Sequence, residues 1–187
     1  DFSIDTSTPS LVRNLNKCIL CRRCVSVCNE IQQAGILFPN KRGFGSFIGP
    51  AYGEPLNNMP CSLCGQCVLV CPTGALHEKE DIDRVWQAIE DPNKHVVIQT
   101  APAIRVSIGE ALGLPPGSIV TGKLVAGLRR LGFDRVFDTD FAADLTIMEE
   151  GHEFLERIAQ SGPFPLITSC SPGWVKFCEH NFPEFLN

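Results

Sequence analysis

The chain has 187 residues and a formal net charge of −5, with 16 Lys and Arg against 21 Asp and Glu. This mild acidity argues against a nucleic-acid footprint, which requires clustered basic side chains. An apolar fraction of 44% is normal for a globular protein that buries a core. No apolar run approaches the roughly 18–20 residues of a membrane span, so we expect neither a nucleic-acid partner nor a membrane span.

Cysteine usage points to the chemistry of the chain. Ten cysteines are many for this length, and eight of them fall in two tight clusters. The N-terminal residues 1–5 lack the basic and apolar regions of a signal peptide and an initiator Met. We therefore expect a cytoplasmic protein whose printed sequence is an internal piece of a longer polypeptide. In that compartment metal ligation is a better prediction than disulfides.

In chain order, residues 1–16 are polar and irregular, which predicts a leader or linker. An apolar stretch follows each cysteine cluster and predicts a short helix, over 25–31 and again over 68–76. The segment 35–60 between them is rich in Gly, Pro and Asn, which predicts turns and short hairpin strands.

From residue 81 onward, predicted strands alternate with predicted helices. The helices are expected over 81–90 with Asp81 as the cap, 104–112, 122–131 closed by Gly132, 142–160, and 174–182. The strands are expected over 96–99, 135–137 and 164–168. This alternation predicts an α/β layer with a parallel sheet.

The clustered cysteines form an internal repeat with the spacing C-x2-C-x2-C-x3-C. The members are Cys18, Cys21, Cys24 and Cys28, and again Cys61, Cys64, Cys67 and Cys71. In bacterial ferredoxins with this spacing, three thiolates hold one [4Fe–4S] cluster and the fourth ligates the other cluster. Residues 17–80 are therefore predicted to be an α+β ferredoxin-like module that binds two [4Fe–4S] clusters and transfers single electrons.

Crossed ligation assigns the cysteines to two sets. One cluster is expected on Cys18, Cys21, Cys24 and Cys71, and the other on Cys61, Cys64, Cys67 and Cys28. Structural zinc and disulfides are the alternative interpretations, but zinc prefers two separated C-x2-C knuckles to three cysteines in one loop. Pro72 follows Cys71 as the motif expects, whereas Asn29 follows Cys28. This departure is minor, because the proline turns the chain and does not ligate.

Taken alone, the residues of the second half give weaker signals. Glu149, Glu150 and Glu153 lie on one predicted helix, and their composition favours a solvated acidic face. Cys170 lies where a predicted strand meets a Ser-Pro-Gly turn, a common place for functional side chains. A packed structural cysteine is an equally good interpretation there.

Five longer motifs carry a resemblance to a known family. They are Asn16-Lys17-Cys18-Ile19-Leu20-Cys21-Arg22-Arg23-Cys24, Thr100-Ala101-Pro102-Ala103-Ile104-Arg105, Phe137-Asp138-Thr139-Asp140-Phe141-Ala142-Ala143-Asp144, Thr146-Ile147-Met148-Glu149-Glu150 and Thr168-Ser169-Cys170-Ser171-Pro172-Gly173-Trp174. From about residue 11 onward the chain resembles the catalytic large (alpha) subunit of [FeFe]-hydrogenases, particularly the multimeric NAD(P)-linked type. The last motif is very similar to the first of three signatures around the catalytic H-cluster. The resemblance implies a partial α/β hydrogenase domain over 81–187, truncated before the second and third signatures.

The resemblance also implies an activity and its partners. In that family the ferredoxin module feeds the H-cluster, a [4Fe–4S] cubane joined to a two-iron centre, which interconverts protons and H2. Flavin- and NAD(P)-binding subunits, iron–sulfur subunits or ferredoxin are the implied electron partners.

Individual residues receive roles from the same resemblance. Ala101, Pro102 and Ala103 are expected to line the pocket of the two-iron centre. Cys170 is expected to be the last proton donor, with Glu150 and Glu153 relaying protons to it from the surface. Burial is expected to raise the pKa of both glutamates.

Ser171 departs from the family pattern. Where members have two adjacent cysteines, the second is a cubane ligand, so here Ser171 or Cys170 ligates instead, or the site differs in activity. The other three cubane cysteines are absent from the printed residues. The leading prediction is an [FeFe]-hydrogenase iron–sulfur subunit. The alternatives are a non-catalytic electron-transfer or scaffold subunit with a degenerate hydrogenase fold, and an iron–sulfur assembly or sensor protein.

Overall fold

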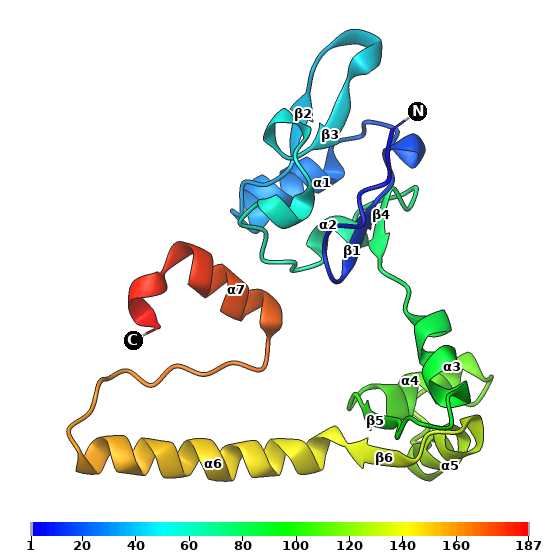
Figure 1. Ribbon diagram of the computed structural model, residues 1–187, viewed down its shortest axis with the longest axis vertical. Coiled ribbons are helices and arrows are strands. Elements are labelled where there is room, and N and C mark those ends of the chain that lie inside the picture. Colours follow the sequence, from blue (N-terminus) through cyan, green and yellow to red (C-terminus); the bar gives the residue numbers. More distant parts are fainter. Residues whose placement is uncertain (1, 187) are drawn as a thin grey trace. The chain divides into compact units, whose positions relative to one another are not determined.

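The computed structural model describes residues 2–186, which form two units (Figure 1). The first unit consists of Asp1–Glu80 together with Ile167–Asn187, and the second of Asp81–Leu166. Residues 167–186 belong to the first unit, although the sequence analysis assigned them to the second half.

Two small antiparallel sheets and short helices build the first unit. Strand β1 (Leu11–Arg13) pairs with β4 (Leu76–Glu78), and β2 (Phe38–Asn40) pairs with β3 (Phe47–Gly49). The helices are α1 (Arg23–Ser26), continued by a π-helical turn (Val27–Ile31), and α2 (Gln66–Leu69). The helical stretch over 25–31 and the hairpin within 35–60 are confirmed as elements.

The prediction of an irregular leader over residues 1–16 is wrong for Leu11–Arg13, which form strand β1. Leu11 and Val12 are buried in β1, which pairs with the far end of the cysteine-rich segment. Asp5 also forms an antiparallel bridge with Arg13, in which each backbone N–H donates to the other's carbonyl at 2.9 Å. The N-terminal segment thus belongs to the fold, because pairing with β4 satisfies its backbone groups and buries its apolar side chains.

The helix predicted over 68–76 is also too long. Helix α2 ends at Leu69, and Leu76 already lies in β4. Pro72 lacks an N–H and disfavours helical backbone at the residue before it, and Gly74 has a positive φ of 62°. The chain therefore turns after Cys71 and returns as a strand.

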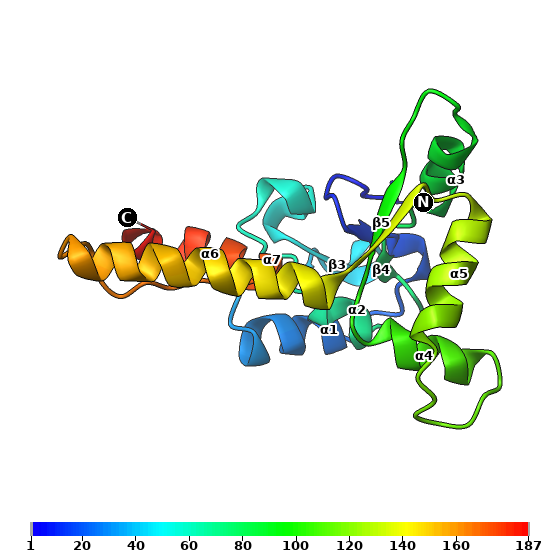
Figure 2. The ribbon, with the colours of Figure 1, turned by 90° about the horizontal axis from the view of Figure 1, so that it is seen from below.

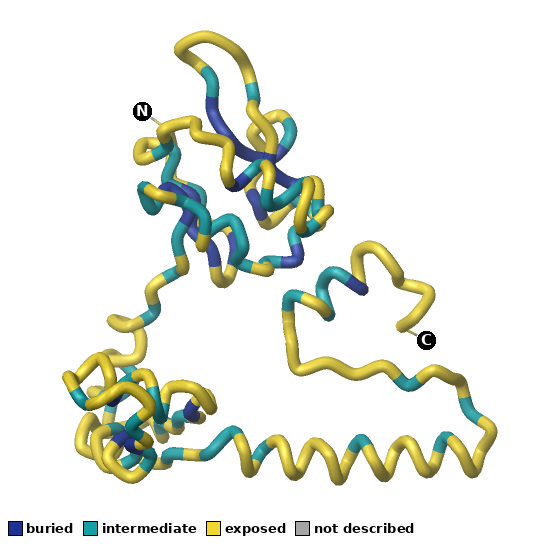
Figure 3. The backbone as a smooth tube through the Cα atoms, turned by 180° about the vertical axis from the view of Figure 1, so that it is seen from behind, coloured by how far each residue is buried: buried dark blue, intermediate teal, exposed yellow. Residues whose placement is uncertain are grey.

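The cysteines lie against the hydrophobic core of the first unit. This core is a cluster of buried side chains: Cys24, Ile36, Leu37, Ile48, Leu56 and Leu76. Five more of the repeated cysteines are partly buried and pack against it: Cys18, Cys28, Cys61, Cys67 and Cys71. Figure 3 shows most of the buried segments within this part of the chain.

The second unit alternates helices with strands, as the sequence predicts. Its elements are α3 (Ile82–Glu90), β5 (Val97–Thr100), α4 (Ile104–Ala111), α5 (Thr121–Leu131), β6 (Arg135–Asp138) and α6 (Thr139–Ala159). Strands β5 and β6 pair in parallel, with Val97 opposite Arg135 (Figure 2). The parallel sheet and these helices are confirmed.

Residues at the ends of these helices determine where each helix begins or stops. Asp81 precedes α3 without accepting a capping hydrogen bond, and instead pairs with Arg84 at 2.6 Å. Helix α6 begins at Thr139, three residues earlier than expected, because the Asp138 side chain caps it by accepting from Asp140 N–H at 3.0 Å. Gly132 closes α5 at a φ of 111°, which matches its predicted role as the C-cap.

The strand predicted over 164–168 is not formed. A strand needs a neighbour for its backbone groups, and those residues pair with neither β5 nor β6 in the described part of the chain. Helix α7 (Pro172–Asn181) follows and matches the predicted helix over 174–182, with Ser171 as its N-cap.

Helix α6 is exposed along most of its length (Figure 3). Four of its apolar side chains are exposed: Leu145, Met148, Leu155 and Ile158. Across residues 2–186 we find no helix whose length and apolar character would let it cross a membrane.

Candidate iron–sulfur site

Two apolar cavities in the first unit are each lined by four cysteines. The cysteines of the first cavity are Cys18, Cys21, Cys24 and Cys71. The cysteines of the second cavity are Cys28, Cys61, Cys64 and Cys67. Each cavity thus combines three cysteines of one repeat with the last cysteine of the other.

The two cysteine loops share an unusual backbone. Leu20 and Arg22 have φ values of 58° and 63°, and Leu63 and Gly65, at equivalent positions of the second loop, have 56° and 75°. Left-handed conformations at non-glycine residues cost about 1–3 kcal/mol each and cluster at functional sites. Such alternation turns successive backbone N–H groups towards one side, where they can donate to an anion. Accordingly, Leu20 N–H donates to Cys18 Sγ at 3.5 Å.

The thiols of the first cavity interact electrostatically. Burial raises the pKa of Cys24 to about 11, and the nearby thiols of Cys18, Cys71 and Cys21 act in the same direction. Burial also acts to raise the pKa of Cys71, but hydrogen bonds from backbone N–H groups, including that of Leu76 at 3.5 Å, lower it overall. When these thiols ionise, their negative charges repel one another across the cavity. Iron ions bound between the thiolates would offset this repulsion.

The second cavity has the same character. Burial raises the pKa of Cys67 to about 12, with smaller contributions from Cys61, Cys64 and Cys28 and a further one from Cys24 of the first cavity. Burial likewise raises the pKa of Cys61, while the Lys176 ammonium on α7 acts against that rise. The thiols of the two cavities therefore interact mainly, but not solely, within the two groups that the linings define.

The donor set fits [4Fe–4S] clusters better than the alternatives. All ten cysteines are free thiols. Nowhere in residues 2–186 do three His, Cys, Asp or Glu side chains converge closely enough to hold a single metal ion, as zinc would require. Four thiolates spread around one cavity suit a cubane, whose four irons each take one ligand.

Arg13 is a member of the first cavity's lining that the sequence analysis did not assign to the site. Its side chain is only 7% exposed, and its Nε has no hydrogen-bond partner in the described part of the chain. Such an orphaned buried donor fits a cavity that takes an anionic group. In the sequence, the one signal for Arg13 is that a cation directly follows the apolar residues Leu11 and Val12. The structure shows that both of these residues are buried in the same strand.

The N-terminus of α7 contacts the loop of the second cavity. A Cβ atom added to Gly173 would lie 3.5 Å from both the Cα of Cys64 and the carbonyl oxygen of Ser62. Ser171 and Trp174 line one surface pocket together with Cys64. The Cys170–Ser171 segment is thus adjacent to the second cavity.

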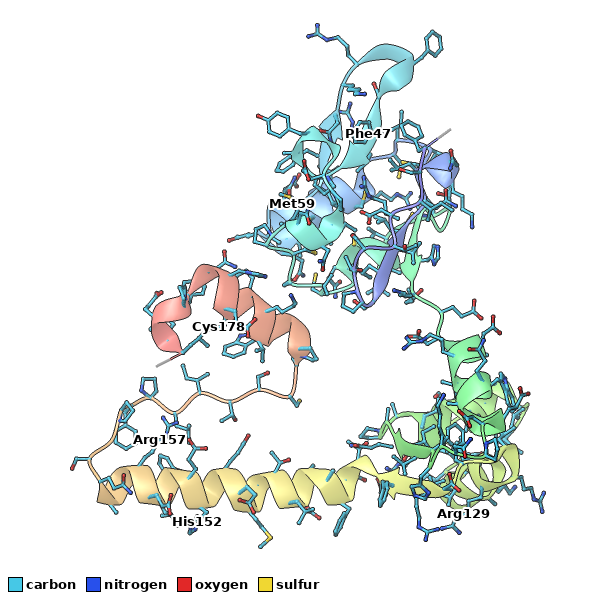
Figure 4. All side chains as sticks on the ribbon, in the orientation of Figure 1. Phe47, Met59, Arg129, His152, Arg157 and Cys178 are labelled. Atoms are coloured by element: carbon cyan, nitrogen blue, oxygen red, sulfur yellow. The ribbon has the colours of Figure 1, made fainter. Side chains whose placement is uncertain are left out.

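Cys170 and Ser171 themselves are exposed. The Ser171 Oγ accepts from Trp174 N–H at 3.4 Å as the α7 cap, and Ser171 N–H donates to Ser169 Oγ at 3.1 Å. Cys170 presents a free thiol. Cys178 is buried within α7 (Figure 4) and lines neither cavity.

The remaining predicted site residues belong to the second unit. Exposed residues 101–103 connect β5 to α4. Arg105 holds this connection, because its Nε donates to the Pro102 carbonyl at 3.0 Å and its guanidinium pairs with Asp138 at 2.8 Å. The backbone N–H of Asp140 and the Arg105 guanidinium lower the pKa of Asp138.

Glu150 and Glu153 lie on α6, where Glu150 is half-buried. Glu153 pairs with Arg157 at 2.6 Å. Arg157 is labelled in Figure 4, near the end of α6. The Glu153 side chain is 50% exposed, so the burial predicted for it is not found in this chain. Because these residues and Cys170 belong to different units, the predicted proton relay stays a prediction.

Comparisons with known proteins identify two families in this chain. Residues 17–75 match the 4Fe-4S dicluster domain, so the first unit is that of an iron–sulfur protein with two [4Fe–4S] clusters. Residues 94–187 match the iron only hydrogenase large subunit, C-terminal domain, a family whose cofactors include the H-cluster. The chain belongs to this iron-only hydrogenase large-subunit family, which confirms the predicted resemblance.

Individual relatives include two hydrogenases. The NADP-reducing hydrogenase subunit HndD of Solidesulfovibrio fructosivorans is 54% identical over 184 residues, which are 95% of this chain and 32% of the relative. Iron hydrogenase 1 of Clostridium pasteurianum is 45% identical over 185 residues, or 98% of this chain and 32% of the relative. The chain therefore spans about a third of the length of these relatives.

A different kind of relative is the cytosolic iron-sulfur assembly component 3 of Bos taurus. It is 31% identical over 129 residues, which are 64% of this chain and 27% of the relative. The relatives of this chain thus include a protein whose name refers to cluster assembly rather than to hydrogen.

Proposed function

We propose that this chain is the electron-transfer part of an [FeFe]-hydrogenase large subunit, which carries electrons through two [4Fe–4S] clusters to or from an H-cluster that interconverts protons and H2. The observation that supports it most is the pair of crossed, four-cysteine cavities, one of which contacts the segment of the first hydrogenase signature. Whole-protein activity is part of the proposal, because the relatives are about three times as long.

The ligand sets are proposed as crossed. Cys18, Cys21, Cys24 and Cys71 hold the outer cluster, and Cys61, Cys64, Cys67 and Cys28 hold the inner one. When bound, such clusters supply one-electron carriers whose potential is set by local charge, hydrogen bonds and solvent exposure. The chain's own contribution is to hold the thiolates, donate backbone N–H groups to sulfur and surround each cavity with apolar side chains.

The inner cluster is the one proposed to exchange electrons with the hydrogen-converting centre. Gly173 supports this order, because it places the first turn of α7 against the Cys64 loop, where an added Cβ would lie 3.5 Å from the Cα of Cys64. Helix α7 thereby brings the Cys170–Ser171 segment beside the second cavity and not beside the first.

For the hydrogen chemistry we propose Cys170 as the final proton donor, with Glu150 and Glu153 behind it. Its exposed free thiol is compatible with that role. Ser171 is proposed as the residue at the cubane-ligand position, although its Oγ also caps α7. Ala101, Pro102 and Ala103 are proposed to line the two-iron pocket.

The finer architecture is part of the same proposal. We assign residues 17–80 to an α+β ferredoxin-like module and residues 81–187 to a partial α/β hydrogenase domain. We also propose flavin- and NAD(P)-binding or iron–sulfur subunits, or ferredoxin, as electron partners, which the HndD relative supports. A cytoplasmic location is proposed from the ten free thiols.

Iron and acid-labile sulfide analysis with EPR of the reduced protein tests the proposal. The anaerobically reconstituted chain is expected to hold about eight irons, as two [4Fe–4S] clusters require. Cys64→Ala should lose about half of the iron, whereas Cys178→Ala is the matched control because Cys178 lines neither cavity. A colourless protein, or one that binds zinc in place of iron, would contradict it.

The second candidate function is cluster assembly or sensing, which the assembly relative favours. The two hydrogenases match almost the whole chain at higher identity. The discriminating experiment uses the whole subunit loaded with its two-iron centre and a low-potential electron donor. H2 evolution that Cys170→Ala severely reduces supports the hydrogenase, and absence of any H2 evolution favours the assembly protein.

A further inference from the structure

The two cysteine-lined cavities differ in charge. The wall of the first includes Arg13 and Arg22, whereas the wall of the second includes no Lys, Arg, Asp or Glu in the described part of the chain. Arg22 is exposed, but the Arg13 side chain is only 7% exposed. A buried charge acts more strongly on its surroundings than an exposed one, because water and salt screen it less.

The Arg13 guanidinium is held in a defined position. Its Nη2 contacts the Asp5 carboxylate at 3.2 Å and the Glu54 carbonyl at 3.4 Å, and its Nη1 donates to the Ile48 carbonyl at 3.4 Å. A Cβ at Gly49 would overlap Nη1, so the guanidinium occupies space that only a glycine leaves open. The cation therefore stays at the cavity wall rather than turning towards solvent.

One nitrogen of this guanidinium makes no hydrogen bond among the described residues. It is the buried Nε. Buried guanidinium N–H groups without an acceptor are costly, and native proteins rarely leave them so. Thiolate or cluster sulfur in the adjoining cavity is an acceptor of suitable charge.

We propose that Arg13 raises the reduction potential of the cluster held by Cys18, Cys21, Cys24 and Cys71 above that of its twin. Reduction adds one negative charge to a cluster, and a nearby buried cation stabilises that charge. The first electron to enter the module is therefore held on the outer cluster. This inference rests on the proposed ligand sets.

Two further charges modify the size of the effect. The Asp5 carboxylate pairs with the guanidinium and offsets part of its field. Lys176, on α7, acts on the Cys61 thiol of the second cavity. It is half-buried, so water screens it more than it screens Arg13. The inequality between the clusters thus depends mainly on the balance between Arg13 and Asp5.

EPR-monitored redox titration of the reconstituted chain tests this balance. Arg13→Met should lower the midpoint of the outer cluster so that its oxidised-to-reduced ratio at a fixed potential rises about tenfold, which is 59 mV for a one-electron couple. Asp5→Asn should raise the same midpoint, and Arg13→Lys should retain most of the wild-type value. Arg42→Met removes one exposed cation that lines neither cavity and is the matched control. The EPR signal of the outer cluster is identified in a Cys64→Ala background, because this substitution removes a ligand of the inner cluster only.

The outcomes separate the inference from the proposed function. Failure of the wild-type chain to hold two [4Fe–4S] clusters would defeat both. Two clusters with an Arg13→Met shift no larger than that of Arg42→Met would overturn the inference alone. If Arg13→Met does not retain its iron, Asp5→Asn decides: a raised outer midpoint supports the role of Arg13, and an unchanged one rejects it.

Discussion

Individual thiols determine how the iron-free chain responds to pH. The pKa values of Cys24 and Cys67 are raised by burial to about 11 and about 12, above the ordinary thiol value of about 8.5. Their neutral, protonated forms are thus favoured by the fold. Binding of iron reverses this preference, because the ligand is the thiolate.

The first prediction concerns this titration. A thiol whose pKa is raised on folding contributes stability that is complete below its ordinary pKa and is lost as pH rises through the raised value. The urea midpoint of the iron-free chain should therefore fall as pH rises from about 8.5 towards about 11. The lowered pKa of Cys71 acts in the opposite direction and makes the fall smaller. Cys67→Ala should show a flatter profile, and a midpoint that rises over this range would contradict the explanation.

A second prediction at the residue scale concerns Gly132, which has a φ of 111°. A Cβ there would also lie 2.6 Å from Cγ2 of Ile89. Gly132→Ala should destabilise the chain by about 1–3 kcal/mol, measured by thermal unfolding followed by circular dichroism. Gly127→Ala is the control on the same helix, where nothing lies within 4 Å, and it should stabilise α5 by about 0.5–1 kcal/mol. Equal effects of the two substitutions would show that the left-handed cap is not needed.

At the scale of elements, α7 places the segment that begins at Cys170 beside the second cavity, where the inner cluster is proposed. Its capping residue Ser171 and the small Gly173 bring the helix N-terminus against the Cys64 loop. This contact is a close approach of two backbones, which a side chain much larger than a methyl group would obstruct.

Substitutions at Gly173 test the electron route through α7. A Cβ at 3.5 Å is an ordinary contact, so Gly173→Ala should be tolerated. Gly173→Leu should push α7 away from the Cys64 loop and slow electron delivery without loss of iron. The measurement is the rate of H2 evolution by the loaded whole subunit from a low-potential donor, alongside its iron content. Unchanged rates in Gly173→Leu would reject α7 as the route.

Sequence patterns predicted local elements better than long-range pairings. The helices after residue 81 and strands β5 and β6 carry periodic or apolar patterns, and Gly132 carries a local capping signal. By contrast, β1 pairs with β4 across some sixty residues of sequence. A strand of this length carries no sequence pattern that predicts its partner strand. The apolar run over 164–168 satisfied a strand pattern but found no neighbouring strand.

The candidate site divides in the same way. The cysteine spacing predicted the crossed grouping, because the motif encodes which sulfurs face each cluster. Arg13 could not be assigned from its position, since its burial depends on Ile48 and Gly49, which are distant in sequence, as well as on the nearer Asp5. Contacts that form only on folding are therefore the part that the sequence alone did not reveal.

At the scale of the whole molecule, the proposed crossed ligation joins the two repeats of the first unit into one body. Each repeat supplies a cysteine to the other's cavity, so on this proposal neither cluster forms within one repeat. The β1–β4 pairing joins the two ends of the same segment. Electron transfer between the clusters and the stability of the fold then depend on the same four-cysteine sets.

The most direct measurement compares iron content in two double variants of the reconstituted chain. Crossed ligation predicts that Cys21→Ala with Cys71→Ala removes ligands from one cluster only and leaves about four irons. It predicts that Cys21→Ala with Cys28→Ala disturbs both clusters and leaves few or none. The reverse result, with four irons retained in the second variant and none in the first, would contradict the crossed arrangement and the electron path that depends on it.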